Sequence, residues 1–175
     1  MSNITFVRGN LFHSSMQTYA NTINTVGVMG AGIAKQFKTK FPAMFKDYQQ
    51  RCAHHKVIAG EPYLWKPTDE GTAWVLNFPT KQHWRGKSKI EWIEEGLTYL
   101  LHHYCEWGIQ SLAVPALGCS LGGLKWEQVK PVMEHYLGQL DIPVEIYEPL
   151  PELKKSKQKQ RRKPKSKASP QPKLF

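Results

Sequence analysis

The fold is decided by residues 19–34, whose sequence is YANTINTVGVMGAGIA. A β-type run over 19–23 leads into a glycine-rich turn, and a helical pattern follows over 31–40 until Pro42 stops it. Free amides in such a turn, together with the positive end of the helix, favour an anion. The spacing fits neither a dinucleotide fingerprint nor a P-loop, which disfavours a dehydrogenase and an NTPase. A tight connection without a ligand stays open as the alternative.

Outward from this stretch, short β-type runs alternate with longer helical patterns, and no internal repeat is present. We expect strands at 4–7, 19–23, 74–78, 111–114 and 144–147, a weaker one at 63–65, and helices at 31–40, 43–54, 88–107 and after Trp126. Ser88 and Glu91 have the spacing of a capping box, which predicts that the third helix starts at Ser88. The alternation predicts an α/β domain with a mainly parallel or mixed sheet between helices.

A second glycine-rich loop, PALGCSLGGLKW at 115–126, follows the expected strand at 111–114. Loops at the carboxyl ends of neighbouring parallel strands flank one crevice, so the two loops could clamp the two phosphates of a diphosphate. Neither loop contains a carboxylate that would attract Mg²⁺. The sequence therefore predicts anion binding without a metal or cofactor.

A third motif, NFPTKQHWR at 77–85, places several cationic and aromatic side chains within five residues. A lysine beside a diphosphate can act as a charge partner or, when desolvated, lose its proton and become a nucleophile, which makes Lys81 the sharpest candidate. The alternative is that Lys81 and Arg85 are surface charges and Trp84 belongs to the core.

Together the three motifs resemble the macrodomain family, in particular the branch with DNA ADP-ribosyl glycohydrolases of the DarG antitoxin type and the terminal ADP-ribose glycohydrolase of animals. The resemblance covers roughly residues 3–148, and its specific strings are NTVGVMGAGIA at 24–34 and the two motifs at 77–85 and 115–126. It implies a three-layer α/β/α sandwich with a mixed, largely parallel sheet, occupying residues 1–150.

The resemblance also implies a set of site residues. Asn10 and Leu11 would lie near the adenine of ADP-ribose, and Asn24 would orient the distal ribose. Gly30, Gly32 and Ile33 would hold the first phosphate loop. The second loop would wrap the diphosphate and the distal ribose, and its ADP-ribose-binding residues would be Leu117, Gly118, Cys119, Ser120, Leu121, Gly122, Gly123 and Leu124. Lys81 would be the hydrolytic lysine, as nucleophile or as a charge. Gly122 stands where the animal relative has an aspartate.

The activity implied is removal of ADP-ribose from a modified base in single-stranded DNA, with His83, Trp84 and Arg85 stacking on or hydrogen-bonding the exposed base. An ADP-ribosyltransferase toxin would be its functional counterpart. The alternatives are a reader that binds ADP-ribose without cleaving it, a hydrolase of ADP-ribosylated protein, a nucleic-acid-binding protein with an idle cleft, and a hydrolase that uses Cys119 as nucleophile.

The net charge of +10 comes entirely from the end of the chain. Residues 154–175 contain ten Lys or Arg and no acid, which leaves 14 cations against 14 carboxylates in residues 1–153. Such a segment cannot bury enough apolar surface to fold, so we expect a disordered basic tail over 151–175 that binds nucleic acid. A solubilising tail without a specific role is the alternative.

Composition and residue spacing exclude several other classes of protein. Apolar residues make up 41% of the chain, and its three cysteines lack the spacing of a disulfide framework or a zinc site. No run approaches the roughly 18 apolar residues of a membrane span, and the start has no signal-peptide pattern. We therefore expect a cytoplasmic monomer of one folded domain, with no membrane partner.

Overall fold

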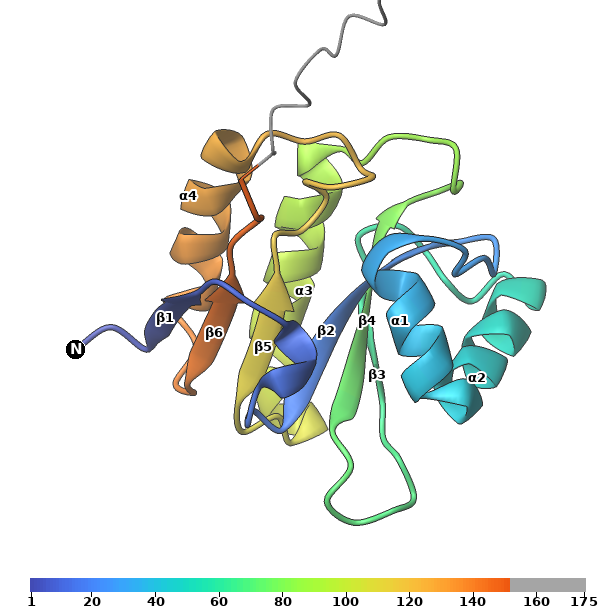
Figure 1. Cartoon of the computed structure of the whole chain (residues 1–175), viewed down its shortest axis with the longest axis horizontal. Coiled ribbons are helices and arrows are strands. Elements are labelled where there is room, and N and C mark those ends of the chain that lie inside the picture. Colours follow the sequence, from blue (N-terminus) through green and yellow to red (C-terminus); the bar gives the residue numbers. More distant parts are fainter. Residues whose placement is uncertain (152–175) are drawn as a thin grey trace, which may run out of the picture.

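The computed structural model describes residues 1–151, which form a six-stranded sheet in the order β1-β6-β5-β2-β4-β3 (Figure 1). The strands are β1 (Ile4–Val7), β2 (Thr18–Asn24), β3 (Tyr63–Trp65), β4 (Trp74–Lys81), β5 (Leu112–Pro115) and β6 (Val144–Tyr147). Every pair is parallel except β3 with β4, which is antiparallel. The sheet is therefore mixed and largely parallel, as expected.

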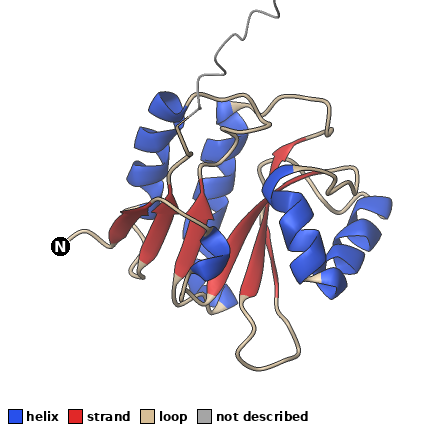
Figure 2. Cartoon of the chain, in the orientation of Figure 1, coloured by secondary structure: helices blue, strands red, loops and turns tan. Residues whose placement is uncertain are grey.

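Helices cover both faces of the sheet (Figure 2). They are the 3₁₀ helix η1 (Leu11–His13), α1 (Gly32–Lys40), α2 (Pro42–Ala53), α3 (Ile90–Trp107) and α4 (Trp126–Leu137). The apolar residues of α3 and α4 form one core cluster with the sheet, and those of η1, α1 and α2 form a second cluster on its other face. This confirms the three-layer α/β/α sandwich.

The order of the strands explains where a site can form. β2 lies between β5 and β4, so the carboxyl ends of these three neighbours meet at one edge of the sheet. The two glycine-rich loops and the third motif follow those ends. β4 is longer than predicted, because Pro79 and Lys81 still pair with Ile23 and Asn24 of β2 across a register shift. Lys81 is therefore the last residue of a strand rather than part of a loop.

The capping-box prediction is wrong. Helix α3 begins at Ile90, its N-cap is Lys89, and the cap makes no side-chain hydrogen bond. The backbone N–H of Ser88 instead donates to the Gly122 carbonyl oxygen at 3.0 Å. That bond ties Ser88 to the second glycine-rich loop, and its buried hydroxyl oxygen has no hydrogen-bond partner among residues 1–151. The other end of α3 is as predicted, because Gly108 stops it in the left-handed conformation.

The predicted basic tail at 151–175 lies outside the described residues except for Pro151. Within residues 1–151, no helix is both long and apolar enough to cross a membrane. The same part of the chain contains no cluster of three or more His, Cys, Asp or Glu side chains that could hold a metal ion.

Candidate active site

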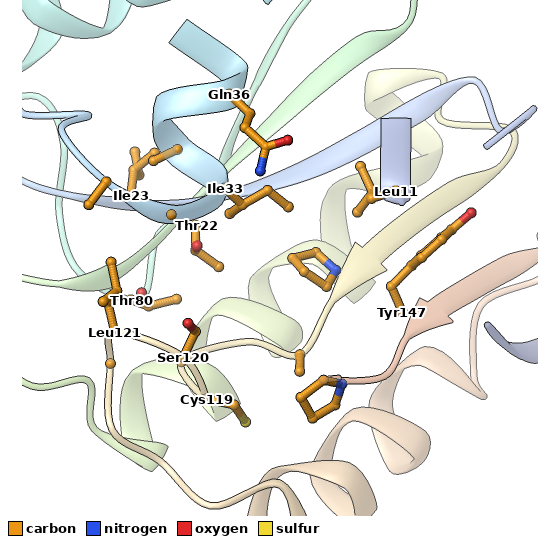
Figure 3. A pocket seen from close by; sticks show the side chains of 18 of the residues that line it. Leu11, Thr22, Ile23, Ile33, Gln36, Thr80, Cys119, Ser120, Leu121 and Tyr147 are labelled. Carbon is orange, nitrogen blue, oxygen red and sulfur yellow. The ribbon is translucent and has the colours of Figure 1, made fainter. Parts of the chain in front are cut away.

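A cavity of about 860 Å³ opens at the carboxyl ends of the parallel strands. Its wall is made by η1, the ends of β2, β4 and β6, the start of α1 and the second glycine-rich loop. Figure 3 shows that the cavity has two ends, with Leu11 and Tyr147 on one side and Thr80 and Leu121 on the other. Ile33 and Gln36 of α1 lie along the wall between them. The cavity is large enough for a nucleotide-sized ligand.

The first glycine-rich loop is braced by the side chain of Asn24. Its amide nitrogen donates to the Val28 carbonyl oxygen at 2.7 Å, and its amide oxygen accepts from the backbone N–H of Val26 at 3.1 Å and of Val28 at 3.4 Å. Asn24 is buried, with 7% of its surface exposed, although it borders the cavity. The side chain therefore fixes the shape of the turn that precedes α1.

A second residue, Tyr48 of α2, holds Asn24 from behind. The Tyr48 hydroxyl shares its single proton between the backbone oxygen of Asn24 at 2.9 Å and the amide oxygen at 2.8 Å. Tyr48 is completely buried, and burial raises its pKa well above the ordinary value, so the hydroxyl keeps its proton at any physiological pH. The sequence did not single out Tyr48 for this role. An aromatic residue at a core-facing helix position gives no sign of it.

The second glycine-rich loop is held by backbone bonds. The N–H of Leu124 donates to the Gly118 carbonyl oxygen at 2.9 Å, and that of Gly123 to the Ser120 carbonyl oxygen at 3.2 Å. Gly118 has a φ of +72°, which side chains rarely adopt. A Cβ on Gly122 would lie 2.3 Å from the Ser88 hydroxyl oxygen and 2.4 Å from the Gly118 carbonyl oxygen. The loop therefore accepts only glycine at Gly122 in its present shape.

Lys81 enters the cavity from the end of β4 and reaches across to the second loop. Its Nζ donates to the Leu121 carbonyl oxygen at 3.0 Å. Because Thr80 and Leu121 mark one end of the cavity, the amine lies at the end opposite Leu11 and Tyr147. Partial burial lowers the pKa of Lys81 below its ordinary value, since the charged form loses solvation there.

Trp84, three residues after Lys81 in the chain, also borders the cavity and is 47% exposed. The ring of His83 stacks on it with centroids 5.4 Å apart, and the guanidinium of Arg85 lies 4.5 Å from the Trp84 ring centroid. The three side chains form one exposed cluster beside the cavity, with Trp84 as the member in its wall. The alternative that Trp84 belongs to the core is therefore wrong.

Most of the predicted ligand-binding residues come together in this cavity. Its wall includes Asn10, Leu11, Asn24, Gly30, Gly32, Ile33, Lys81, Trp84, Gly118, Cys119, Ser120, Leu121 and Gly122. Three others do not line it, namely Leu117, Gly123 and Leu124. Leu117 is completely buried in the core beneath the loop, which explains why it faces no ligand space. His83 and Arg85 lie outside the wall, on exposed chain.

Some cavity residues were missed by the sequence analysis. Tyr147, Glu148, Pro149 and Leu150 border the cavity at the end of β6, and Thr22, Thr80 and Gln36 are among the other residues of its wall. The signal that could have found the first group is topological, because β6 lies beside β5 and its carboxyl end meets the same edge of the sheet. That neighbour relation links residues far apart in sequence and is not visible as a local pattern.

Cys119 borders the cavity, but its environment opposes a thiolate. Burial raises the pKa of the thiol to about 11, and the nearby carboxylate of Glu127 adds to the shift. The thiol contacts the Leu117 carbonyl oxygen at 3.6 Å. A neutral thiol is a weak nucleophile, so the structure disfavours the alternative of a cysteine hydrolase.

The comparison with protein families agrees with this geometry, since the sequence model of the Macro domain matches residues 20–133. The chain belongs to the macro domain family. The family resemblance implied an ADP-ribose cleft between the two glycine-rich loops, and both loops line the cavity of this macrodomain.

The chain is similar in sequence to proteins named as DNA ADP-ribosyl glycohydrolases. The chain is 44% identical over 164 residues to a DNA ADP-ribosyl transferase-DNA ADP-ribosyl glycohydrolase fusion protein of Thermosipho africanus, covering 85% of this chain and 42% of that protein. It is 41% identical over 150 residues to a DNA ADP-ribosyl glycohydrolase of Thermus aquaticus, covering 83% of this chain and 41% of that protein. The chain thus spans about two fifths of the length of each of these two relatives.

A solved structure, described as Thermosipho africanus DarTG in complex with ADP-ribose, matches this macrodomain with a TM-score of 0.82. The identity is 45%, and the match covers 86% of this chain and 42% of that one. The shared fold therefore extends across nearly all of the described macrodomain.

Proposed function

We propose that this macrodomain is a DNA ADP-ribosyl glycohydrolase that binds ADP-ribose linked to a nucleobase and hydrolyses the bond at the distal ribose. The observation that carries the proposal is the position of Lys81, whose Nζ lies in the cavity and donates to Leu121 of the second glycine-rich loop at 3.0 Å. A loop suited to a diphosphate and an amine suited to the adjoining sugar are thereby joined in one site.

The two ends of the cavity give the ligand a direction. In the proposal the adenine lies between Leu11 and Tyr147, and the diphosphate lies against the amides of the two glycine-rich loops. The distal ribose then falls at the end with Lys81 and Trp84. The modified base leaves the cavity there, beside the exposed cluster of His83, Trp84 and Arg85.

The chemistry assigned to Lys81 follows from its environment. Burial lowers its pKa, which increases the fraction of neutral amine able to attack the anomeric carbon. The bond between that carbon and the base nitrogen breaks with its electron pair on the nitrogen, which then takes up a proton. Water subsequently releases the lysine, so the net reaction adds one water across the glycosidic bond. The result is free ADP-ribose and an unmodified base.

Asn24 takes a positioning role in the proposal. Its amide nitrogen donates to the first glycine-rich loop, and its amide oxygen accepts from that loop and from the Tyr48 hydroxyl. A side chain with its hydrogen bonds committed in this way orients the distal ribose mainly through the loop that it shapes.

Gly122 favours a base-linked substrate over an ester-linked one. A side chain at this position would meet the Ser88 hydroxyl oxygen and the Gly118 carbonyl oxygen at less than 2.5 Å, so a carboxylate cannot stand there without moving the loop. The route implied for the animal relative, in which a lysine and an aspartate act in turn on a carboxylate ester, therefore has no second group at this position.

The relatives support the assignment by their names. The Thermosipho africanus relative combines a DNA ADP-ribosyl transferase with a DNA ADP-ribosyl glycohydrolase. By that analogy we propose an ADP-ribosyltransferase toxin as the functional counterpart of this chain, which would place the chain in the cytoplasm as its antitoxin. Binding of nucleic acid by the basic segment 154–175 belongs to the same proposal, because its ten cations suit a polymer of phosphates.

The test is release of ADP-ribose from three defined substrates by the full chain. These are an oligonucleotide ADP-ribosylated on thymine, one ADP-ribosylated on guanine, and a peptide ADP-ribosylated on glutamate, with products identified by mass spectrometry. We expect the base-linked substrates to be cleaved and the peptide to persist. Cleavage of the peptide alone would make the chain a protein ADP-ribosyl hydrolase. Calorimetric binding of ADP-ribose without cleavage of any substrate would make it a reader.

A further inference from the structure

The charges of the described domain balance overall but not locally. Between Glu70 and Glu91 the chain carries four cationic side chains, Lys81, Arg85, Lys87 and Lys89, and no carboxylate. Of these, only Lys81 enters the cavity. The other three stand on residues 82–89, which join β4 to α3 and which we call the β4–α3 loop. A local excess of three positive charges thus lies immediately outside the cavity.

The β4–α3 loop is open to solvent. All of its residues are exposed except Ser88, whose backbone N–H is bonded to Gly122 of the second glycine-rich loop. None of its cations forms an ion pair with a carboxylate in the described part of the chain. Two of them lie on indole rings instead, Arg85 on Trp84 at 4.5 Å and Lys89 on Trp92 at 4.9 Å from the ring centroids.

The loop also leads away from the reacting end of the cavity. Lys81 precedes it, Trp84 borders the cavity, and Lys87 runs beside Gly123 of the second loop, its side chain 3.9 Å from where a Cβ on Gly123 would lie. On the far side, the carboxylates of Glu91, Glu94 and Glu95 begin directly after the loop. A polyanion that leaves the cavity over Trp84 would meet cations along the loop and repulsion beyond it.

We propose that the β4–α3 loop binds the sugar-phosphate backbone of single-stranded DNA beside the modified nucleotide, with Lys87 and Lys89 as phosphate contacts. The proposal rests on the function proposed above and adds which residues hold the phosphates next to the modified nucleotide, so that a strand is bound more tightly than a modified nucleoside. In the proposed function ADP-ribose lies inside the cavity, whereas Lys87 and Lys89 stand outside its wall. The loop carries one exposed indole ring, that of Trp84, among cations that have no carboxylate partner in the described part of the chain. Proteins bind single strands by such a combination of stacking and charge.

The loop selects against a duplex. A base linked to ADP-ribose must leave the stack for the sugar to enter the cavity, and a flexible single strand permits this at the smallest energetic cost. The three cations of the loop stand on a single segment, which can follow the backbone of one strand but not the two backbones of a duplex. The strand would therefore pass along the loop, between the second glycine-rich loop and the carboxylates of α3.

The experiment compares the full-length chain with the double variant Lys87→Ala/Lys89→Ala and the control Lys66→Ala. Lys66 is also an exposed lysine on an indole ring, that of Trp74 at 4.5 Å, but it stands at the opposite end of β4. Two substrates are used, ADP-ribosylated thymidine and an ADP-ribosylated ten-nucleotide strand. The basic segment 154–175 is present in every protein, so its contribution cancels in the comparison.

We expect the double variant to lower kcat/KM for the strand roughly three- to tenfold, as two exposed charge contacts would, and to leave turnover of the nucleoside within about twofold. The slope of log kcat/KM against log salt for the strand should fall by about 1.4, since each phosphate contact to a single strand contributes about 0.7. Lys66→Ala should change neither value. Equal losses on both substrates, or no loss on the strand, would overturn the proposal.

A second readout separates this proposal from the proposed function. Anisotropy of an unmodified labelled strand reports binding even if no substrate is cleaved. Weaker binding by the double variant than by Lys66→Ala would support the loop as a DNA contact although the hydrolase assignment had failed. If polyglutamate displaces the strand from the wild-type chain but not from the double variant, the loop binds polyanions generally and the assignment to DNA is overturned.

Discussion

The two glycine-rich loops follow neighbouring strands and face the same cavity, yet they are held in different ways. The first is fixed from within by Asn24, which bonds Val26 and Val28, and from behind by the buried Tyr48. The second is closed by its own backbone, through Leu124 to Gly118. The one side-chain hydrogen bond that it receives from another element within residues 1–151 is the bond from Lys81 to Leu121.

The first loop is therefore prearranged, whereas the second loop is coupled to the reacting group, the amine of Lys81. The first loop has its shape before any ligand arrives, because the side chain of Asn24 already holds Val26 and Val28 in place. The second loop is tied to the amine itself, so a phosphate that moves Leu121 also alters the surroundings of Lys81. Binding of the diphosphate and activation of the amine can therefore be connected through a single hydrogen bond.

Among substitutions that test the difference between the two loops, Gly122→Ala should weaken ADP-ribose binding most. The new methyl group would lie 2.4 Å from the Gly118 carbonyl oxygen, so the second loop must move. Overpacking of this kind costs about 1–3 kcal/mol, which corresponds to a roughly 5- to 150-fold weaker Kd for ADP-ribose by calorimetry. Gly30→Ala in the first loop should cost less, because its methyl would meet Val28 at an ordinary 3.6 Å. Equal losses at the two positions would remove the distinction between the loops.

A smaller effect is expected from Tyr48→Phe, which removes the hydroxyl that holds Asn24. The Asn24 amide oxygen keeps its backbone donors, so the loss is that of one buried hydrogen bond, about 1 kcal/mol or roughly a fivefold weaker Kd for ADP-ribose. Tyr104→Phe serves as control, because the Tyr104 hydroxyl accepts from the backbone N–H of Asp141 on the other side of the sheet. If both variants lower the melting temperature and only Tyr48→Phe weakens binding, Tyr48 positions the first loop. Identical affinities would refute that role.

The smallest effect is expected from Cys119→Ser in the second loop. The pKa of the thiol is raised to about 11, so it is neutral at pH 8 and takes no part in the reaction. The serine hydroxyl can still approach the Leu117 carbonyl oxygen, and hydrolysis should stay within about twofold of wild type. A loss of more than about tenfold would restore the cysteine hydrolase as a candidate.

Much of this site could be predicted from the sequence because its signals are local. A strand, a glycine-rich turn and a helix start are encoded by adjacent residues, and two such units with a motif around Lys81 were enough to indicate one cleft. The periodic apolar residues Ile93, Leu97, Leu100 and Tyr104 likewise identified α3, and all four are buried. Local periodicity predicted these elements because each faces one layer of the core.

The features that were not predicted depend on pairs that lie far apart in the chain. Lys81 ends a strand only because β4 pairs with β2, and its amine meets Leu121 across 40 residues. Ser88 and Glu91 have the spacing of a capping box, but the bond from Ser88 to Gly122 excludes it. Tyr48 meets Asn24 across 24 residues. No local spacing carries information on these contacts, since the sheet order creates them.

The most direct test of the central claim, that the amine of Lys81 performs the chemistry, is the pH dependence of hydrolysis for wild type and Lys81→Ala. Single-turnover rates on a thymine-ADP-ribosylated strand would be measured from pH 6 to 10. Because burial lowers the pKa of Lys81 and only the neutral amine attacks, the wild-type rate should rise about tenfold per pH unit below that pKa and then level off. Lys81→Ala should be slower by about 100-fold or more and show no such rise, while calorimetry finds ADP-ribose still bound. Superimposable profiles for the two proteins would contradict the account.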